Sequence, residues 1–408
     1  MNTADSYDIV IAGGGMIGTS LGLALSTVGA RVAVVEPIER TAVQQPSFDD
    51  RSTALSRSSQ RTFEALGLWP EIAAASSPIR HIHVSDRGRF GFSHIDADEQ
   101  GVEALGYVVI NRVLGDVLQR ALDSASDVDQ FCPERITAVK TLENGVAAVL
   151  GDGENELHCR LLVAADGARS TVREMLGIGA LVVAYDQHAV VGNLLPEKPH
   201  EACAYERFTE EGPLALLPVS DERVAFVWTL DPAEADQVMA LDDDAFTQRL
   251  QSAFGYRLGR FSKIGRRSQY PLGLSKANGL VAGRGVLVGN AAHGLHPVAA
   301  QGFNLGLRDV AALAECIADA RGDGNTDAGA ATILERYADW RHSDQQKLVH
   351  FTDGLVRLFG SQRRSLRLLR DVGMLGFDLV PGVRRQFARH TMGLAGELPR
   401  LSRGVPLQ

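Results

Sequence analysis

Short, mainly apolar runs occur in four places, and such runs are typical of strands that are buried on both faces. They cover residues 7–12, 31–36, 157–164 and 285–289. A helix of small residues, expected over 19–28, joins the first two runs into a βαβ unit. The other two runs come from distant parts of the chain, yet they end in glycine-containing turns as the first does. We therefore expect one parallel sheet whose ligand-binding turns meet at a single edge.

Between residues 180 and 275 the pattern changes to short alternating runs separated by Gly, Pro and acidic turns, which favours an antiparallel sheet. The clearest runs are 189–194, 202–208, 214–218 and 224–230. The predicted fold class is α/β, with a Rossmann-like parallel-sheet domain, an inserted antiparallel-sheet domain and a C-terminal helical segment. The expected boundaries are 1–76, 100–179 and 276–350 for the first domain, 77–99 and 180–275 for the second, and 351–408 for the C-terminal segment.

The turn after the first run reads Gly13-Gly-Gly15-Met-Ile-Gly18, and Glu36 ends the next strand. Gly13 permits the tight turn, Gly15 lets the backbone approach a pyrophosphate, and Gly18 lets the helix close on the strand. Glu36 can bind both hydroxyls of an adenosine ribose, which disfavours a 2′-phosphate at that position. The sequence therefore predicts a dinucleotide site that suits FAD or NAD better than NADP.

A second glycine-rich loop, residues 289–301, lies between the last strand and a helix expected over 303–320. Backbone N–H groups of residues 302–304 would stand at the N-terminus of that helix, where partial positive charge favours an anionic or electron-rich ligand edge. His293 and His296 are three residues apart in the loop, but no third ligand has a spacing that completes a metal site. We expect helix capping or loop hydrogen bonds from these histidines, and no metal.

With 408 residues, 45% of them hydrophobic and 22% charged, the chain is long enough for two domains with sizeable cores. No window approaches the roughly 18 apolar residues of a membrane span, and the polar first residues do not resemble a signal peptide, so we expect a cytoplasmic protein. Cys132, Cys159, Cys203 and Cys316 show no metal or redox spacing, which fits reduced thiols. The acidic balance, a formal charge of −9, gives no reason to expect a nucleic-acid partner.

The C-terminal segment, residues 351–408, departs from this balance because it carries ten Arg against four acidic residues, interleaved with Leu, Met and Phe. One interpretation is a helix pair that packs on the body and shows its Arg side chains to water. The other is contact with an anionic membrane surface or an acidic partner. The sequence leaves both open.

The order of these elements resembles that of the flavoprotein aromatic hydroxylases of the para-hydroxybenzoate hydroxylase type, and most closely the ubiquinone-biosynthesis hydroxylases, over residues 5–350. Asn290 and residues 296–310 carry the strongest likeness, with Asn290 where most relatives have Asp and Ala300 where Gly is typical. An amide can still accept and donate hydrogen bonds, so cofactor binding need not be lost. The resemblance implies that FAD is held by Gly13, Gly15, Gly18, Glu36, Arg51, Arg112, Asp166, Gly167, Asn290, Pro297, Gly302, Phe303 and Asn304.

By the same resemblance the protein is an NAD(P)H- and FAD-dependent aromatic-ring monooxygenase. A flavin C4a-hydroperoxide formed with O2 would hydroxylate a polyprenylated phenol of the 2-polyprenyl-6-methoxyphenol type on the path to ubiquinone. Such an intermediate needs a dry, apolar pocket, for which the strands at 212–218 and 224–230 could form a wall. Tyr185, His188 and Tyr205 could orient the phenol hydroxyl, although each also fits an ordinary sheet residue. No catalytic acid or base identifies itself.

Other functions stay open. The chain could hydroxylate another ring position or a soluble aromatic acid, it could be a flavin reductase of the same fold that does not use O2, or it could hold flavin in an assembly without turnover. An isoprenoid substrate partitions into membrane, so we expect peripheral contact with the inner membrane, or with a ubiquinone-biosynthesis complex, through residues 351–408.

Overall fold

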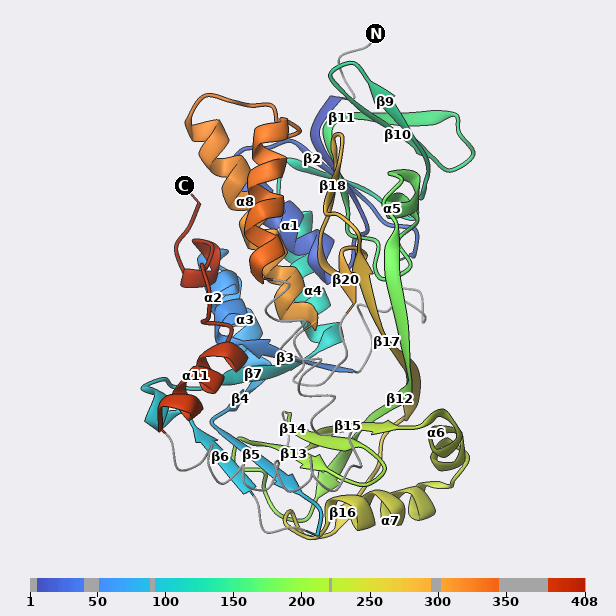
Figure 1. The fold of residues 1–408 in the computed structure, drawn as a ribbon, viewed down its shortest axis with the longest axis vertical. Helices are drawn as coiled ribbons and strands as arrows, with labels where there is room; N and C mark the ends of the chain where they lie inside the picture. The colour runs from blue at the N-terminus through green and yellow to red at the C-terminus, as the bar shows by residue number, and fades with distance from the viewer. Residues whose placement is uncertain are drawn as a thin grey trace.

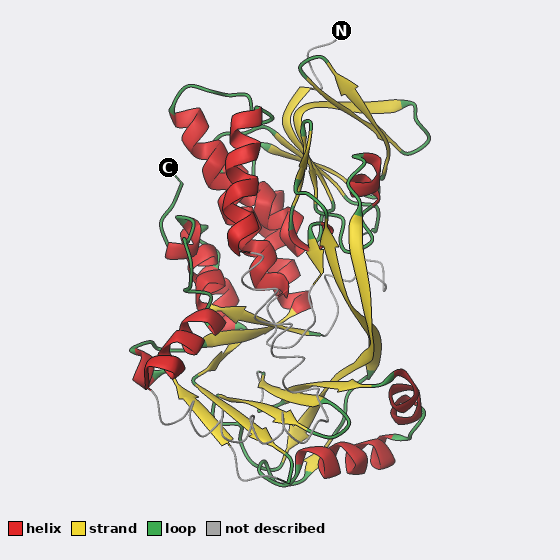
Figure 2. Cartoon of the chain, viewed as in Figure 1, coloured by secondary structure: helices red, strands yellow, loops and turns green. Residues whose placement is uncertain are grey.

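The computed structural model describes residues 6–39, 51–88, 92–219, 222–294, 302–344 and 381–407. Within these residues the strands form three sheets (Figure 1). A mainly parallel sheet lies at one end of the molecule, a large mixed sheet lies at the other, and a small sheet lies between them (Figure 2). This α/β architecture with an added antiparallel sheet confirms the predicted fold class.

The first sheet has the strand order β18-β19-β11-β1-β2-β8. The pairs from β19 to β8 are all parallel, so the distant apolar runs are neighbours in one sheet, as their pattern predicts. The antiparallel extension by β9 and β10 was not predicted. The strands are β1 (Ser6–Ala12), β2 (Val32–Val35), β8 (Val128–Phe131), β9 (Ile136–Leu142), β10 (Gly145–Leu150), β11 (Asn155–Ala164), β18 (Val281–Ala282) and β19 (Gly285–Leu287).

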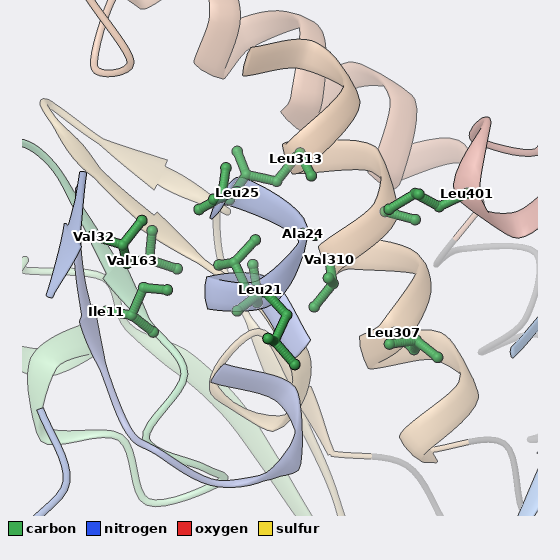
Figure 3. Close-up of a cluster of buried hydrophobic side chains, with 14 of the residues drawn as sticks. Ile11, Leu21, Ala24, Leu25, Val32, Val163, Leu307, Val310, Leu313 and Leu401 are labelled. Atoms are coloured by element: carbon green, nitrogen blue, oxygen red, sulfur yellow. The ribbon is translucent and has the colours of Figure 1, made fainter. Parts of the chain in front are cut away.

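Three helices pack on one face of this sheet: α1 (Met16–Ser26), α4 (Asn111–Asp123) and α8 (Gly302–Gly322). Their apolar side chains and those of the sheet form one buried cluster, shown in Figure 3. Leu21 of α1 and Val310 of α8 are fully buried there. Burial of each such side chain stabilises the fold by about 1.5–3 kcal/mol. The cluster therefore holds α1 and α8 in fixed positions on the sheet.

The second sheet has the order β20-β17-β12-β15-β14-β13-β5-β6, with β16 paired to β12. Most pairs are antiparallel, but β13 and β5 run in parallel. Helices α6 (Pro232–Met239) and α7 (Asp243–Phe254) cover one face, and neither was predicted. The strands are β5 (His81–Asp86), β6 (Phe92–Asp96), β12 (Ala180–Pro196), β13 (Cys203–Phe208), β14 (Pro213–Pro218), β15 (Val224–Leu230), β16 (Phe261–Ser262), β17 (Ser268–Ala277) and β20 (His293–Gly294).

The small sheet, in the order β3-β7-β4, was also not predicted. It consists of β3 (Ser52–Ser56), β4 (Ser76–Ile79) and β7 (Gly106–Ile110), with α2 (Arg57–Ala65) and α3 (Trp69–Ala74) between β3 and β4 in sequence. Val108 of β7 lies in one buried cluster with Ala204 and Ala225 of the second sheet. The small sheet therefore joins the two larger ones. Short 3-10 turns occur at Asp98–Gln100, Gly289–Ala291 and Leu401–Arg403.

The last described part of the chain, residues 381–407, packs on the body of the protein. Ala388 and Met392, at the end of α11 (Pro381–Thr391), are buried, and so is Leu401. Arg400 forms ion pairs with Glu315 and Asp319 of α8. Of the two interpretations of the basic segment, packing on the body therefore holds for this part, while residues 351–380 lie outside the described residues. Among the described helices, none has the length and apolar character needed to cross a membrane.

Candidate functional site

The glycine turn after β1 lies directly against the turn after β11. Gly13 has φ +106°, and a Cβ on it would stand 2.6 Å from the carbonyl oxygen of Ala165. A Cβ on Gly18 would stand 1.9 Å from the carbonyl oxygen of Gly13, a distance that no side chain can occupy. Both positions therefore require glycine, one for its backbone angle and close approach, the other for contact between α1 and its own turn.

The N-terminus of α1 has no side-chain cap within the described residues. Gly15 is its N-cap residue, in an extended conformation, and no side chain of the described residues caps the helix there. The first turn also contains no acidic residue. Backbone N–H groups at an uncapped N-terminus, together with the helix dipole, favour a phosphate or another anion. We call residues 13–18 the glycine cradle, because its uncapped backbone N–H groups are of the kind that bind a pyrophosphate.

The carboxylate of Glu36 forms hydrogen bonds with the glycine cradle and with the backbone next to it. Its Oε2 accepts a hydrogen bond from the Gly14 N–H at 2.7 Å, and its Oε1 accepts one from the Ile38 N–H at 3.0 Å. The sequence suggested only a contact to a ribose. The structure adds that the same carboxylate holds the glycine turn in place at the end of β2.

The turn after β11 is organised by Asp166. This carboxylate accepts hydrogen bonds from the Ser170 hydroxyl and, at 3.1 Å, from the Val172 N–H at the start of α5 (Thr171–Met175). Gly167 has φ +88°, which glycine adopts without strain. The buried Arg173 donates from Nη1 to the carbonyl of Ala291 at 3.1 Å. That bond ties the second turn to the third motif, a link that the sequence does not reveal.

Asp309 of α8 holds the beginning of the third motif. Its Oδ2 accepts a hydrogen bond from the Gly289 N–H at 2.9 Å and lies 2.6 Å from Nε2 of His293. Its Oδ1 accepts a hydrogen bond from Nε of Arg341 at 2.7 Å. Burial alone would raise the pKa of Asp309, but the interactions with His293 and Arg341 outweigh it and lower that pKa to about 2. His293 therefore makes the loop hydrogen bond expected of it.

A second carboxylate extends this buried network. Asp344 lies 2.6 Å from Nη1 of Arg341 and 2.8 Å from Nη1 of Arg308. The side chain of Arg341 is fully buried, so its charge is balanced only by these carboxylates within the described residues. We call His293, Asp309, Arg341, Asp344 and Arg308 the loop-anchoring network.

The N-terminal turn of α8 is fixed to β3 by Asn304. Its Oδ1 accepts hydrogen bonds from the Ser56 N–H at 2.8 Å and the Ser59 hydroxyl at 2.7 Å, and its Nδ2 donates to the carbonyl of Ala54 at 2.9 Å. Phe303 stacks near Phe63, with ring centroids 6.4 Å apart. The helix begins at Gly302 and has no acidic residue in its first turn, so the dipole of this end is not offset by a side-chain carboxylate there.

The remaining candidate residues are less closely grouped. The guanidinium of Arg51 lies 4.7 Å from the ring centroid of Tyr270 in the second sheet. Arg112 is exposed on the first turn of α4, and Asn290 is exposed beside Gly289. Pro297, His296 and Ala300 lie outside the described residues. The structure thus brings together the three turns after β1, β11 and β19, while Arg51 and Asn304 lie where the small sheet meets its neighbours.

Nothing in the described residues suggests a metal site, because no group of three or more His, Cys, Asp or Glu side chains could hold a metal ion there. The four cysteines are free thiols, and burial raises the pKa of Cys159 to about 12.

Tyr205 and His188 both face the helix-covered side of the second sheet. Tyr205 packs against Phe254 of α7, and His188 lies 3.3 Å from Nε2 of Gln269, which also donates to Asp236 of α6. This placement supports their interpretation as ordinary sheet residues.

The fold is that of the FAD-dependent aromatic hydroxylases. p-Nitrophenol 4-monooxygenase from Pseudomonas putida DLL-E4 superposes with a TM-score of 0.79 at 18% identity, over 96% of this chain and 99% of that one. Residues 6–352 match the FAD binding domain family. The chain therefore belongs to this family of FAD-binding proteins, as the motifs indicate.

Two relatives sharpen the comparison. The ubiquinone hydroxylase UbiL of Rhodospirillum rubrum is 39% identical over 98% of this chain and 93% of its own length. The 3-demethoxyubiquinol 3-hydroxylase of Escherichia coli K12 is 31% identical over 96% of this chain and 100% of its own length. The similarity extends over both sheets, and so over the whole architecture rather than the dinucleotide motif alone.

Proposed function

We propose that this protein is an FAD-dependent monooxygenase that uses NAD(P)H and O2 to hydroxylate a polyprenylated phenol of the 2-polyprenyl-6-methoxyphenol type in ubiquinone biosynthesis. The observation that carries the proposal is the identity of 39% and 31% to two ubiquinone-pathway hydroxylases over nearly the full chain. The glycine cradle supports the cofactor half of the proposal, because the N-terminus of α1 has no side-chain cap and no acidic residue in its first turn, as binding of a pyrophosphate requires.

The proposed FAD contacts follow the three turns. The open N-terminus of α1 at Gly15 would bind the pyrophosphate, and Glu36 would bind the adenosine ribose while it holds the turn. Asp166 and Gly167 after β11 would contact the cofactor next to them. The other proposed contacts are Arg51 and Arg112 for the phosphate and ribityl portions, Asn290 for a ribityl hydroxyl, and Pro297 beside the ring system.

The chemistry that FAD supplies when bound is the transfer of electrons from NAD(P)H to O2 and of one oxygen atom to the phenol. The N-terminus of α8, at Gly302, Phe303 and Asn304, would stabilise negative charge that develops on the reduced ring system. Asn304 itself would act through position, since its side chain fixes this turn to β3. The loop-anchoring network would keep the Gly289 turn at a constant distance from the same helix.

We further propose that residues 77–99 and 180–275 form the substrate domain and that residues 1–76, 100–179 and 276–350 form the FAD domain. The small sheet supports this division because β3 and β7 lie between the two larger sheets and contact both α8 and β13 through buried residues. A phenol held at this boundary would be shielded from water by strands β14 and β15, whose residues are mostly apolar.

Peripheral membrane contact through the C-terminal segment is part of the proposal. Arg385 and Arg389 of α11 are exposed, while Ala388 of the same helix and Met392 directly after it are buried. Deleting the whole segment would remove buried side chains, so charge reversal is the better test. We expect Arg385→Glu/Arg389→Glu to lower binding to vesicles of anionic phospholipid. The control is Arg120→Glu at an exposed ion pair on α4. Equal vesicle binding by all three proteins would exclude α11 as the contact.

The test of the proposed reaction uses the purified, FAD-loaded chain with NADH or NADPH and short-chain 2-prenyl-6-methoxyphenol. A monooxygenase transfers one atom of 18O2 to the phenol, and mass spectrometry of the product gives both the label and the ring position. A flavin reductase would oxidise NAD(P)H without labelling the organic product, and an assembly protein would do neither. Labelling of a soluble acid such as 4-hydroxybenzoate instead of the prenylated phenol would move the proposal to that substrate class.

A further inference from the structure

A single row of partly buried side chains crosses five strands of the second sheet. Val191 of β12 is paired with Val227 of β15, Val227 with Ala215 of β14, Ala215 with Glu206 of β13, and Glu206 with Val84 of β5. All five side chains are partly exposed. Four of them are apolar, so Glu206 is the one ionisable group in the row.

This row faces the small sheet, away from α6 and α7. Side chains alternate along β13, so Glu206 points to the same side as Ala204 and opposite to Tyr205. Ala204 is buried in the cluster that contains Val108 of the small sheet, whereas Tyr205 packs against Phe254 of α7. Glu206 therefore lies on the face turned toward the FAD half of the molecule.

Within the described residues the Glu206 carboxylate has no hydrogen-bond or ion-pair partner. Desolvation by the surrounding protein raises its pKa to about 7. The neighbouring strands contribute Val84 and Ala215 beside it, and Asp86 lies on the same face two residues further along β5. A carboxylate without partners in apolar surroundings destabilises the folded protein, and such groups concentrate at functional sites.

We propose that Glu206 accepts the hydroxyl proton of the phenol substrate, an inference that rests on the proposed function. The phenolic O–H bond breaks, an O–H bond forms on the carboxylate, and the negative charge passes to the phenolate oxygen. The ring becomes more electron-rich and therefore more reactive toward an electrophilic oxygen atom. Hydroxylation forms a ring C–O bond and breaks the C–H bond at that carbon. The ring hydrogen leaves as a proton, which ends in the water formed from the second oxygen atom of O2. The carboxylic acid then returns its own proton to the original phenol oxygen, so the carboxylate is restored at the end of each turnover.

The apolar members of the row define the matching part of the substrate. Val191, Val227 and Ala215 would contact the ring face or the first isoprene unit, where burial of apolar surface favours binding. A soluble aromatic acid would bring a second carboxylate toward Glu206, and two like charges at close range disfavour binding. The row therefore fits a neutral prenylated phenol better than an aromatic acid.

The test compares the FAD-loaded wild type with Glu206→Gln and Glu206→Asp. Tyr205→Phe, on the opposite face of the same strand, is the matched control. Four quantities are measured for each protein with 2-prenyl-6-methoxyphenol between pH 5 and 9: bound FAD, phenol affinity from flavin fluorescence, the rate of product formation, and the ratio of hydroxylated product to hydrogen peroxide per NAD(P)H.

We expect Glu206→Gln to form product roughly 100-fold more slowly, the contribution typical of a positioned base, and to lose the rise of product yield with pH. Glu206→Asp should keep the pH dependence at a lower rate, and Tyr205→Phe should resemble the wild type, with FAD content unchanged in all four proteins. An unaltered pH profile and product ratio in Glu206→Gln would overturn the role of Glu206 and leave the proposed function standing. A wild type that labels no phenol would overturn both.

Discussion

Replacement of Asp309 by Asn tests whether the loop-anchoring network stabilises the fold. The substitution keeps the size of the side chain but removes the negative charge that faces His293 and Arg341. Arg341 is fully buried, and loss of one partner from a buried ion pair typically costs about 3–5 kcal/mol. Because Asp344 still lies 2.6 Å from Arg341, we expect the lower end of that range.

The lowered pKa of Asp309 gives the sign and the pH range of the same effect. Its value falls from 3.8 to about 2 in the folded protein. At about 1.4 kcal/mol per pKa unit, the shift corresponds to about 2–3 kcal/mol in favour of the folded state. A depressed pKa means that this stability is fully present above pH ~3.8 and is lost as the pH falls toward 2. The lowered pKa therefore has the same sign as the loss of stability that we expect for Asp309→Asn at neutral pH.

The assay is urea unfolding of the FAD-free protein, followed by circular dichroism, at several pH values. We expect Asp309→Asn to lower the free energy of unfolding by about 3 kcal/mol at pH 7, with a gap to wild type that is constant down to pH 5 and narrows below pH 4. Glu71→Gln, which breaks an exposed ion pair with Arg120, should cost less than ~1 kcal/mol. Equal losses in the two variants, or no loss in Asp309→Asn, would refute this account of the network.

Three further predictions follow from single contacts. Gly18→Ala should lower FAD affinity by roughly tenfold or more in a fluorescence titration, because its Cβ would stand 1.9 Å from the Gly13 carbonyl oxygen. The control Gly322→Ala has open space around it and should bind FAD as the wild type does. Equal affinities in the two variants would contradict the proposed role of the glycine cradle in FAD binding. Asn304→Ala leaves the buried Ser56 N–H without its acceptor and should cost about 1–3 kcal/mol in urea unfolding; a cost near zero would contradict that role. Glu206→Gln should raise the thermal midpoint of unfolding at pH 8 but not at pH 5. The raised pKa of Glu206 means that the wild type loses stability as the pH rises from 4.5 through about 7. An equal gain at both pH values would count against a raised pKa of Glu206.

The sequence pattern predicted the parts of the fold that repeat a simple period. Apolar runs located β1, β2, β11 and β19, and the run after the third motif located α8. It did not locate α7, although Phe246, Leu250 and Phe254 follow helical spacing and Asp242 caps the helix, because the surrounding alternating runs favoured strands throughout. The small sheet was missed for a different reason: its short strands are fixed by pairing with one another rather than by their own pattern.

The candidate site also contains residues that the sequence reveals and residues that it does not. Glycines at fixed spacing reveal the cradle from sequence because each performs a local task at the turn. Asp309 and Arg341 are 32 residues apart and meet only in the folded protein, so no spacing announces their ion pair. The sequence does not reveal Glu206 either, because a polar residue in an alternating strand is ordinary. Only the register of the folded sheet shows that it lies in one row with Val227, Ala215 and Val84.

Asp309 and Glu206 are two carboxylates desolvated by the protein around them, and their opposite pKa shifts have this physical cause in common. Burial disfavours the charged form of both. Asp309 meets His293 and Arg341, whose attraction exceeds that penalty, so its charge stabilises the fold. Glu206 meets no such partner among the described residues, so its charge destabilises the fold and remains available to a ligand. Neutralising the two residues should therefore change stability at pH 8 in opposite directions, and a loss of stability in both variants would show that Glu206 has a structural partner instead of a substrate.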